Sequence, residues 1–285
     1  LRVMGPTGSG KTNFINRLMG RGEDGAAHGL KSHTQAVREH IVNLSNNQQY
    51  VLVDTPGFDD TYRSDRDILK TIADWLERKY RNDVKLTGII YTHRITDNRM
   101  SGSVCKNLDM FGGLCGDTAA ERVRLVTTMW DKAKDKNIAE NRVSQLETNF
   151  WKPLIDAGAR HERFNNSSGS AWKIVRGLTG GGEAVLLQEE LVDVEMKLNE
   201  TTAGKALYLQ FQRLLHEQKE TIKQLQEEAK AQKDSELMKQ LQAEQRRLEA
   251  QLQMMLGNVD ELKIPFARRA ALLFTKRTQA LPVSV

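Results

Sequence analysis

Short apolar runs alternate, over residues 1–180, with segments in which apolar residues recur every three or four positions. The first pattern is typical of buried strands and the second of amphipathic helices. The pattern predicts strands at 1–4, 36–44, 49–53, 86–92, 122–127 and 161–164, and helices at 11–19, 65–80, 104–114, 137–157 and 171–176. Strands separated by helices usually form a parallel sheet with right-handed crossovers. We therefore expect an α/β fold, with a mostly parallel sheet and helices on both of its faces.

The composition changes after Gly180–Gly182, and residues 183–262 are rich in Glu, Gln, Lys, Leu and Ala without proline. Apolar residues there recur three and four positions apart, which is coiled-coil spacing. Gly204 interrupts the pattern, and it is weak over 226–236. Two interpretations stay open: an intermolecular coiled coil with a coiled-coil partner, or a long, partly exposed helix on the sheet domain. We expect three parts: a sheet domain (1–180), a helical or coiled-coil extension (183–262) and a basic amphipathic tail (263–285).

The net charge of +5 comes from the tail, where Lys263, Arg268, Arg269, Lys276 and Arg277 follow the last acidic residue, Glu261. The remaining charges balance, so the basic balance is no argument for nucleic acid, and we expect no nucleic-acid partner. The tail also carries Ile264, Phe266, Leu272, Leu273 and Phe274. Basic and apolar residues together can lie on an anionic membrane surface. The alternative is a helix end that docks on the sheet domain with its charges solvated.

Two cysteines, Cys105 and Cys115, indicate neither a disulfide framework nor a zinc site. No signal peptide is visible, and no apolar run approaches the length of a membrane span. These features favour a cytoplasmic location, with a peripheral membrane association if the tail binds lipid. The chain opens inside a predicted strand without an initiator Met, so we expect upstream residues in the natural protein.

The sequence GPTGSGKT at residues 5–12 follows an apolar strand and precedes an amphipathic helix, which is the context of a phosphate-binding loop. Its backbone N–H groups and the helix N-terminus attract phosphate. Lys11 is expected to reach the terminal phosphates, and the Thr12 hydroxyl to bind Mg²⁺. An ordinary tight turn is the alternative. The residues of this segment assigned to nucleotide binding are Gly5, Thr7, Gly8, Ser9, Gly10, Lys11, Thr12 and Asn13.

Asp54-Thr55-Pro56-Gly57 follows the strand at 49–53. Asp54 can hold Mg²⁺ through water, and the Gly57 N–H can contact a terminal phosphate, although the same residues form ordinary turns. A polar loop at 20–35 could become ordered around the nucleotide. Within it, Thr34 is either a second Mg²⁺ ligand or a solvated loop residue.

A base-binding turn is expected at Thr128–Asp131, after the strand at 122–127. The Asp131 carboxylate can accept two hydrogen bonds from guanine, although Met129 stands where guanine-binding proteins usually have lysine. Asp131 could instead cap a helix. Asn165 and Asn166, after the last predicted strand, could complete the base pocket through their amides.

At these motifs, residues 1–180 resemble the septin-like GTPases, and within them the immunity-associated nucleotide-binding GTPases known as GIMAPs. GPTGSGKT, DTPGFDD, TTMWD and Phe164-Asn165-Asn166 carry the resemblance, and residues 93–99 with TTMWD look like a fungal branch. The resemblance implies a Ras-like P-loop G domain that binds GTP or GDP with Mg²⁺, hydrolyses GTP slowly, forms a nucleotide-dependent homodimer and often works at membranes.

Many efficient GTPases have a glutamine after the glycine of D-x-x-G, where this chain has Phe58. We therefore expect slow intrinsic hydrolysis. The resemblance implies that an arginine after the strand at 86–92 reaches the neighbour's nucleotide in a dimer, and Arg94 or Arg99 occupies that segment. Arg94 could instead pair with Asp97 at the surface. Two other functions stay open: a non-hydrolysing, nucleotide-binding scaffold, and an ATPase.

Overall fold

The computed structural model describes residues 1–21, 36–43, 49–60, 63–178, 181–231 and 235–265. Thr34 and most of the basic tail lie outside these residues. The chain divides into two compact units, Leu1–Ala203 and Gly204–Val285. The segment 183–203, which composition assigned to the extension, therefore belongs to the first unit.

The described residues of the first unit form a six-stranded sheet in the order β2-β3-β1-β4-β5-β6. The strands are β1 (Arg2–Met4), β2 (Arg38–Asn43), β3 (Gln49–Asp54), β4 (Ile89–Arg94), β5 (Val123–Thr128) and β6 (Arg160–Arg163). All neighbours pair in parallel except β2, which runs antiparallel to β3. The carboxyl ends of β1, β3, β4, β5 and β6 therefore meet at one edge of the sheet.

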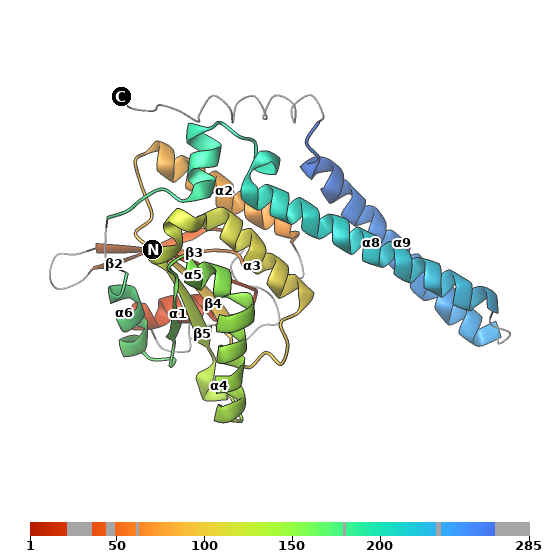
Figure 1. Cartoon of the computed structure of the whole chain (residues 1–285), viewed down its shortest axis with the longest axis horizontal. Coiled ribbons are helices and arrows are strands. Elements are labelled where there is room, and N and C mark those ends of the chain that lie inside the picture. The colour runs from red at the N-terminus through yellow and green to blue at the C-terminus, as the bar shows by residue number, and fades with distance from the viewer. Residues whose placement is uncertain (22–35, 44–48, 61–62, 179–180, 232–234, 266–285) are drawn as a thin grey trace. The chain divides into compact units, whose positions relative to one another are not determined.

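Helices cover both faces of this sheet (Figure 1). In the first unit they are α1 (Lys11–Leu18), α2 (Asp65–Arg81), α3 (Gly102–Cys115), α4 (Lys136–Gln145), α5 (Lys152–Asp156), α6 (Ser168–Arg176) and α7 (Leu186–Gln188). Short 3₁₀ turns are η2 (Asp117–Arg122), η3 (Trp130–Lys132) and η6 (Leu198–Glu200), and π-helical turns are η4 (Leu146–Phe150) and η5 (Glu189–Asp193). Buried residues of α1 and α6 form one core with the β-strand residues Val3, Leu52, Ile90 and Val126.

The predicted α/β class with a mostly parallel sheet is confirmed, and the fold is that of a Ras-like P-loop GTPase domain. Two elements differ most from the predictions. The strand predicted at 86–92 begins at Ile89, because Leu86 pairs with Glu183 instead of joining the sheet. The helix predicted at 137–157 is divided by the π-helical turn η4 and by Trp151, which precedes α5.

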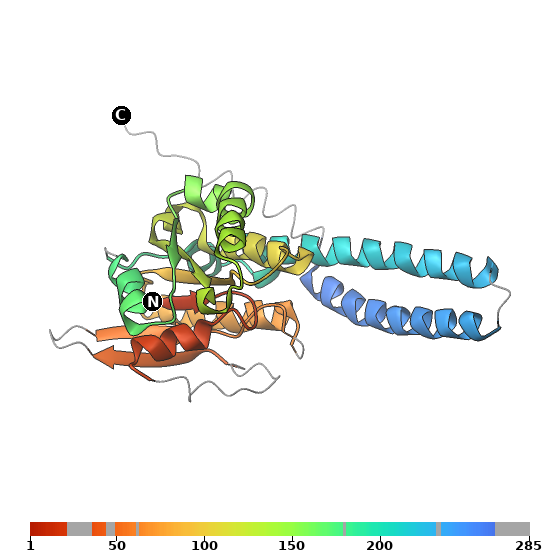
Figure 2. The same ribbon diagram turned by 90° about the horizontal axis from the view of Figure 1, so that it is seen from below.

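The second unit begins within α8 (Thr202–Ala231) and contains α9 (Ser235–Leu262). The two helices run antiparallel to each other (Figure 2). The weak stretch of the apolar pattern at 226–236 therefore coincides with the end of one helix and the start of the next. Within the described residues, no helix is both long enough and apolar enough to span a bilayer.

Candidate nucleotide-binding site

The loop at residues 5–10 leaves β1 at Met4 and enters α1 at Lys11. Gly5, Gly8 and Gly10 have φ angles of 137°, 76° and 91°, which side chains disfavour. Gly5 is also confined by its neighbour, because a Cβ there would lie 2.4 Å from the carbonyl oxygen of Thr92. The glycines therefore permit a tight backbone turn directly before a helix N-terminus, the arrangement that attracts phosphate.

Lys11 lies inside this turn and is only 6% exposed. Its Nζ donates hydrogen bonds to the carbonyl oxygens of Gly5, at 3.1 Å, and Pro6, at 2.9 Å. Burial lowers the pKa of Lys11 to about 8, and the nearby Asp54 carboxylate opposes this effect. The ammonium group is thus held over the loop where phosphate oxygens would bind, and it keeps much of its charge near neutral pH.

Asp54 ends β3 and is 2% exposed, and its Oδ2 accepts a hydrogen bond of 3.0 Å from the Thr12 hydroxyl. A carboxylate and a hydroxyl side by side are the oxygen donors that Mg²⁺ prefers, so these residues fit the ion that the sequence predicts. No cluster of three or more potential His, Cys, Asp or Glu ligands occurs in the described part of the chain. A magnesium ion would therefore take most of its ligands from water and phosphate.

Gly57 lies directly against the phosphate loop. A Cβ at this position would come within 2.6 Å of both Lys11 Nζ and Thr7 Oγ1, and the Thr7 hydroxyl donates to the Gly57 carbonyl oxygen at 3.2 Å. The next residue, Phe58, is 1% exposed, and its carbonyl oxygen accepts from the Thr7 N–H at 2.8 Å. Phe58 thus packs in the core and offers no side-chain group to orient a water molecule.

Threonine hydroxyl groups of β4 and β5 support the phosphate loop through hydrogen bonds. Ser9 Oγ and Thr92 Oγ1 are 2.6 Å apart, and Thr92 also donates to the Met4 carbonyl oxygen at 3.2 Å. Thr128, assigned from the sequence to nucleotide binding, is 2% exposed and donates to the Ser9 carbonyl oxygen at 2.9 Å. Its contact in the structure is therefore with the loop backbone.

The residues proposed for base binding come together at the ends of β5 and β6. Asn166 Oδ1 accepts from Asn13 Nδ2 at 2.9 Å and from Arg17 Nε at 3.0 Å. Its Nδ2 lies 3.5 Å from Asp131 Oδ2. These bonds join α1 to the turn after β5 across the loop after β6. Asn165, by contrast, is exposed, and its backbone N–H donates to Ser170 Oγ at 3.2 Å.

Asp131 is the second residue of η3, whose N-cap is Met129, so it does not cap a helix here. Met129 has a φ of 61°, and its sulfur accepts a 3.8 Å hydrogen bond from Thr96. Two further residues, which sequence reasoning missed, brace this turn. Trp130 Nε1 donates to Thr127 Oγ1 at 2.9 Å, and the Arg163 guanidinium lies 4.6 Å from the Trp130 ring centroid. The spacing of Trp130 and Arg163 gives no signal in the sequence, because they meet only when β5 and β6 pair.

Arg94 ends β4 beside the phosphate loop of its own chain. Its Nε pairs with both carboxylate oxygens of Asp97, at 2.9 and 3.1 Å. A Cβ on Gly8 would lie 3.3 Å from Arg94 NH1, which places the guanidinium at the loop. The pairing with Asp97 agrees with the surface interpretation, and the approach to Gly8 agrees with a role at the phosphates. Arg99 is exposed and further along the same segment.

The comparisons with known proteins agree with this fold. Residues 1–107 match the family model for "50S ribosome-binding GTPase", a match to less than half of the 285 residues. No curated protein sequence matches the chain.

Among solved structures, Toc33 from Arabidopsis thaliana in complex with GDP and Mg²⁺ is 14% identical, with a TM-score of 0.49 over 65% of this chain and 85% of that one. Aquifex aeolicus Era bound to GDP·AlF₄⁻ is 16% identical, with a TM-score of 0.42 over 64% and 57% of the two chains. Likenesses at this level carry no information about what this chain binds.

Proposed function

We propose that the chain is a GTP-binding switch of the septin-like, GIMAP-type group, in a fungal branch, with slow Mg²⁺-dependent hydrolysis and nucleotide-controlled self-assembly. The observation that carries the proposal is the placement of two sets of residues along one sheet edge. Lys11, Thr12 and Asp54 lie at the phosphate loop. Asp131 and Asn166 lie 3.5 Å apart at the ends of β5 and β6, and Asn166 accepts a hydrogen bond from Asn13 of α1, which supports a base pocket beside the loop.

The proposed chemistry is transfer of the terminal phosphoryl group of GTP to water, which yields GDP and phosphate. Lys11 would exchange its two carbonyl partners for phosphate oxygens and neutralise their charge. Mg²⁺ would be held by Thr12 and Asp54, and by Thr34 if that residue is the second hydroxyl ligand, and would supply further charge neutralisation. The Gly57 N–H would contact the terminal phosphate, since a Cβ at this position would lie only 2.6 Å from Lys11 Nζ.

Phe58 supports the expectation of a slow intrinsic rate, because the side chain is buried and has no hydrogen-bonding group. Faster hydrolysis needs a positive charge delivered to the transition state, which is worth about 10³–10⁵ in rate where an arginine supplies it. Arg94 is the first candidate, acting across a homodimer formed through the G domain, and Arg99 is the second. The Arg94–Asp97 ion pair would have to open for the guanidinium to reach a neighbouring molecule.

Other parts of the proposal rest on the sequence. They are a cytoplasmic location, a coiled-coil partner for the extension, peripheral binding of the tail to an anionic membrane, and the absence of a nucleic-acid partner. α8 and α9 run antiparallel to each other in the same chain (Figure 2).

Single-turnover assays with GTP and ATP, each at several protein concentrations, test the proposal. A GTPase switch hydrolyses GTP slowly, faster at higher protein concentration, and leaves ATP intact. A scaffold binds GTP without hydrolysis on the same time scale. Preferential hydrolysis of ATP would favour the ATPase alternative, in which Asp131 faces away from the base.

A further inference from the structure

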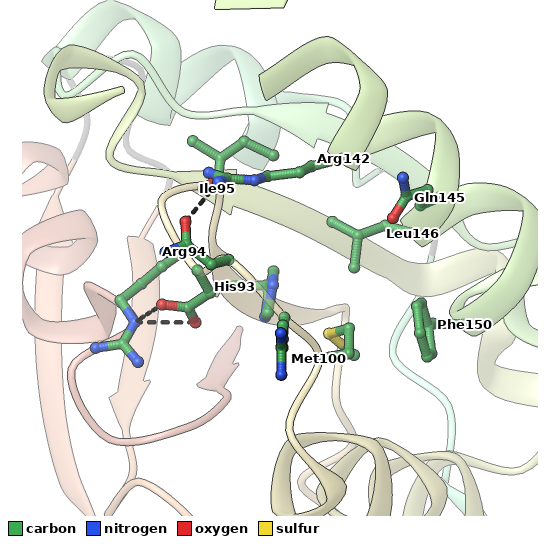
Figure 3. Close-up of a pocket in the computed structure, with 11 residues that line it drawn as sticks. His93, Arg94, Ile95, Met100, Arg142, Gln145, Leu146 and Phe150 are labelled. Atoms are coloured by element: carbon green, nitrogen blue, oxygen red, sulfur yellow. Dashed lines mark hydrogen bonds and ion pairs between the residues drawn. The ribbon is translucent and has the colours of Figure 1, made fainter. Parts of the chain in front are cut away.

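A pocket of about 350 Å³ lies between the segment that follows β4 and the helix α4 with its π-helical turn η4 (Figure 3). Pockets of about 300–1,000 Å³ are the size that holds small organic molecules. The β4 side contributes His93, Ile95 and Met100, and the α4 side contributes Gln145, Leu146 and Phe150. All of these residues belong to the first compact unit and are described by the structure.

The π-helical turn shapes one wall of the pocket. It interrupts the helical run from α4 to α5 at Leu146–Phe150, and both end residues of this turn line the pocket. Such turns are frequently found at functional sites, because the widened helix redirects side chains. The wall is apolar, as is Met100 on the other side, so the pocket can hold an apolar body.

The polar groups of the pocket favour an anion. Arg94, Arg99 and Arg142 line it, and Asp97 is the sole carboxylate among the lining residues, which gives a net charge of +2 (three minus one) with neutral histidine. Asp97 is already paired with Arg94. Arg142 donates to neutral acceptors, the Ile95 carbonyl oxygen at 2.8 Å and Asn98 Oδ1 at 2.6 Å, so its charge is not balanced by these contacts.

His93 provides a buried polar group on the pocket wall. The residue is 4% exposed, its ring lies edge-on to Trp151 with centroids 6.2 Å apart, and burial lowers its pKa to about 4. The ring is therefore neutral near pH 7, with one N–H that can donate to a carboxylate. Figure 3 shows this ring between the end of β4 and the residues from α4 and η4.

We propose that this pocket is a second ligand site, distinct from the phosphate loop, for a small amphipathic carboxylate: one carboxylate joined to a single aromatic ring system or a short acyl chain. The apolar wall formed by Leu146 and Phe150 contacts the body of the ligand. The Arg142 guanidinium and the His93 ring bind its carboxylate. No residue of the phosphate loop lines the pocket, and the two sites are neighbours because Arg94, which lines the pocket, also approaches Gly8 of that loop. The proposal does not rest on which nucleotide the loop prefers.

Calorimetric titrations of the full chain with indole-3-acetate, phenylacetate and octanoate test the proposal, each beside its carboxamide, which keeps the shape and removes the charge. We expect at least one carboxylate to bind saturably at one site, and its amide about fivefold to tenfold more weakly, as when a charge-assisted hydrogen bond is replaced by a neutral one. Binding should persist when GDP is added.

Variants at the exposed Gln145 locate the site. Gln145→Glu adds a negative charge at the rim without a change of size and should weaken binding about fivefold, whereas Gln145→Lys should strengthen it. Ser144→Glu places the same charge one residue away, outside the lining, as the matched control. Met100→Trp should fill the pocket and abolish binding, with unchanged thermal melting as the check that the domain folds.

Four results would overturn the proposal. They are no saturable binding by any of the three carboxylates, equal affinity for acid and amide, equal effects of Gln145→Glu and Ser144→Glu, and displacement of the carboxylate by GDP. The last result would assign the binding to the phosphate loop.

Discussion

Replacing Asp131 by asparagine removes one negative charge at the base end of the site and alters little else. In the structure Asp131 Oδ2 lies 3.5 Å from Asn166 Nδ2. The orientation of the Asn166 amide is fixed, because its oxygen already accepts from Asn13 and Arg17. Asp131→Asn therefore leaves the amide of Asn166 in place and changes only what position 131 offers to a base.

The size of the effect follows from the hydrogen bonds that guanine offers. Its Watson–Crick edge presents two neighbouring N–H donors, and a carboxylate accepts both. An amide accepts one and turns its own donor toward the other, so that one charge-assisted bond is lost and one guanine donor is left without an acceptor. Together these cost about 3 kcal/mol, or roughly a hundredfold in affinity. Xanthine has a carbonyl oxygen in place of one of these donors, so it should bind the variant better than guanine does.

Calorimetry with GDP and XDP on the parent chain and on Asp131→Asn measures both effects. Asp135→Asn is the matched control, since Asp135 caps α4 by accepting from the Asn137 and Ile138 N–H groups, and asparagine caps helices about as well as aspartate. We expect GDP affinity to fall only in Asp131→Asn, with a reversal of preference toward XDP. An unchanged GDP affinity, or equal losses in the two variants, would remove Asp131 from the base pocket.

Three further predictions address hydrolysis, charge and the tail. Specific GTPase activity should rise with protein concentration, and Arg94→Ala should abolish that rise at nearly unchanged GDP affinity; a rise that survives in both Arg94→Ala and Arg99→Ala contradicts this. GDP should bind most tightly below about pH 7 and about tenfold more weakly at pH 9, because deprotonation of Lys11, whose pKa is about 8, removes the charge that phosphate needs. Lys11→Arg should flatten that profile in calorimetry, and a parent profile that is flat to pH 10 argues against the role of Lys11. The full chain should float with anionic liposomes at low salt and not at high salt; absence of flotation at low salt ends the membrane interpretation of residues 263–285.

The sequence predicts the parts of this molecule that depend on local pattern. The sequence pattern places the six strands of the described sheet within a few residues, and it is clearest in β1, β4 and β5, whose apolar runs are buried. The phosphate loop is equally local, since its glycines, Lys11 and Thr12 are consecutive and their positive φ angles follow from the same eight residues.

The parts that sequence reasoning missed depend on contacts between distant residues. The Thr128 hydroxyl donates to the Ser9 carbonyl oxygen, 119 residues away in the chain, a contact that no local pattern indicates. β4 begins at Ile89, three residues after the predicted start, because Leu86 forms an isolated bridge with Glu183. The π-helical turn after α4, which shapes the pocket beside His93, follows a run whose apolar spacing is typical of an ordinary helix.

Equilibrium binding of GDP and ADP, measured side by side with Mg²⁺ on the full chain, tests the central claim most directly. We expect one GDP site per chain and at least about a hundredfold weaker binding of ADP, since adenine presents a donor and an acceptor where Asp131 requires two donors. Equal affinity for the two nucleotides, or no binding of either, would contradict it.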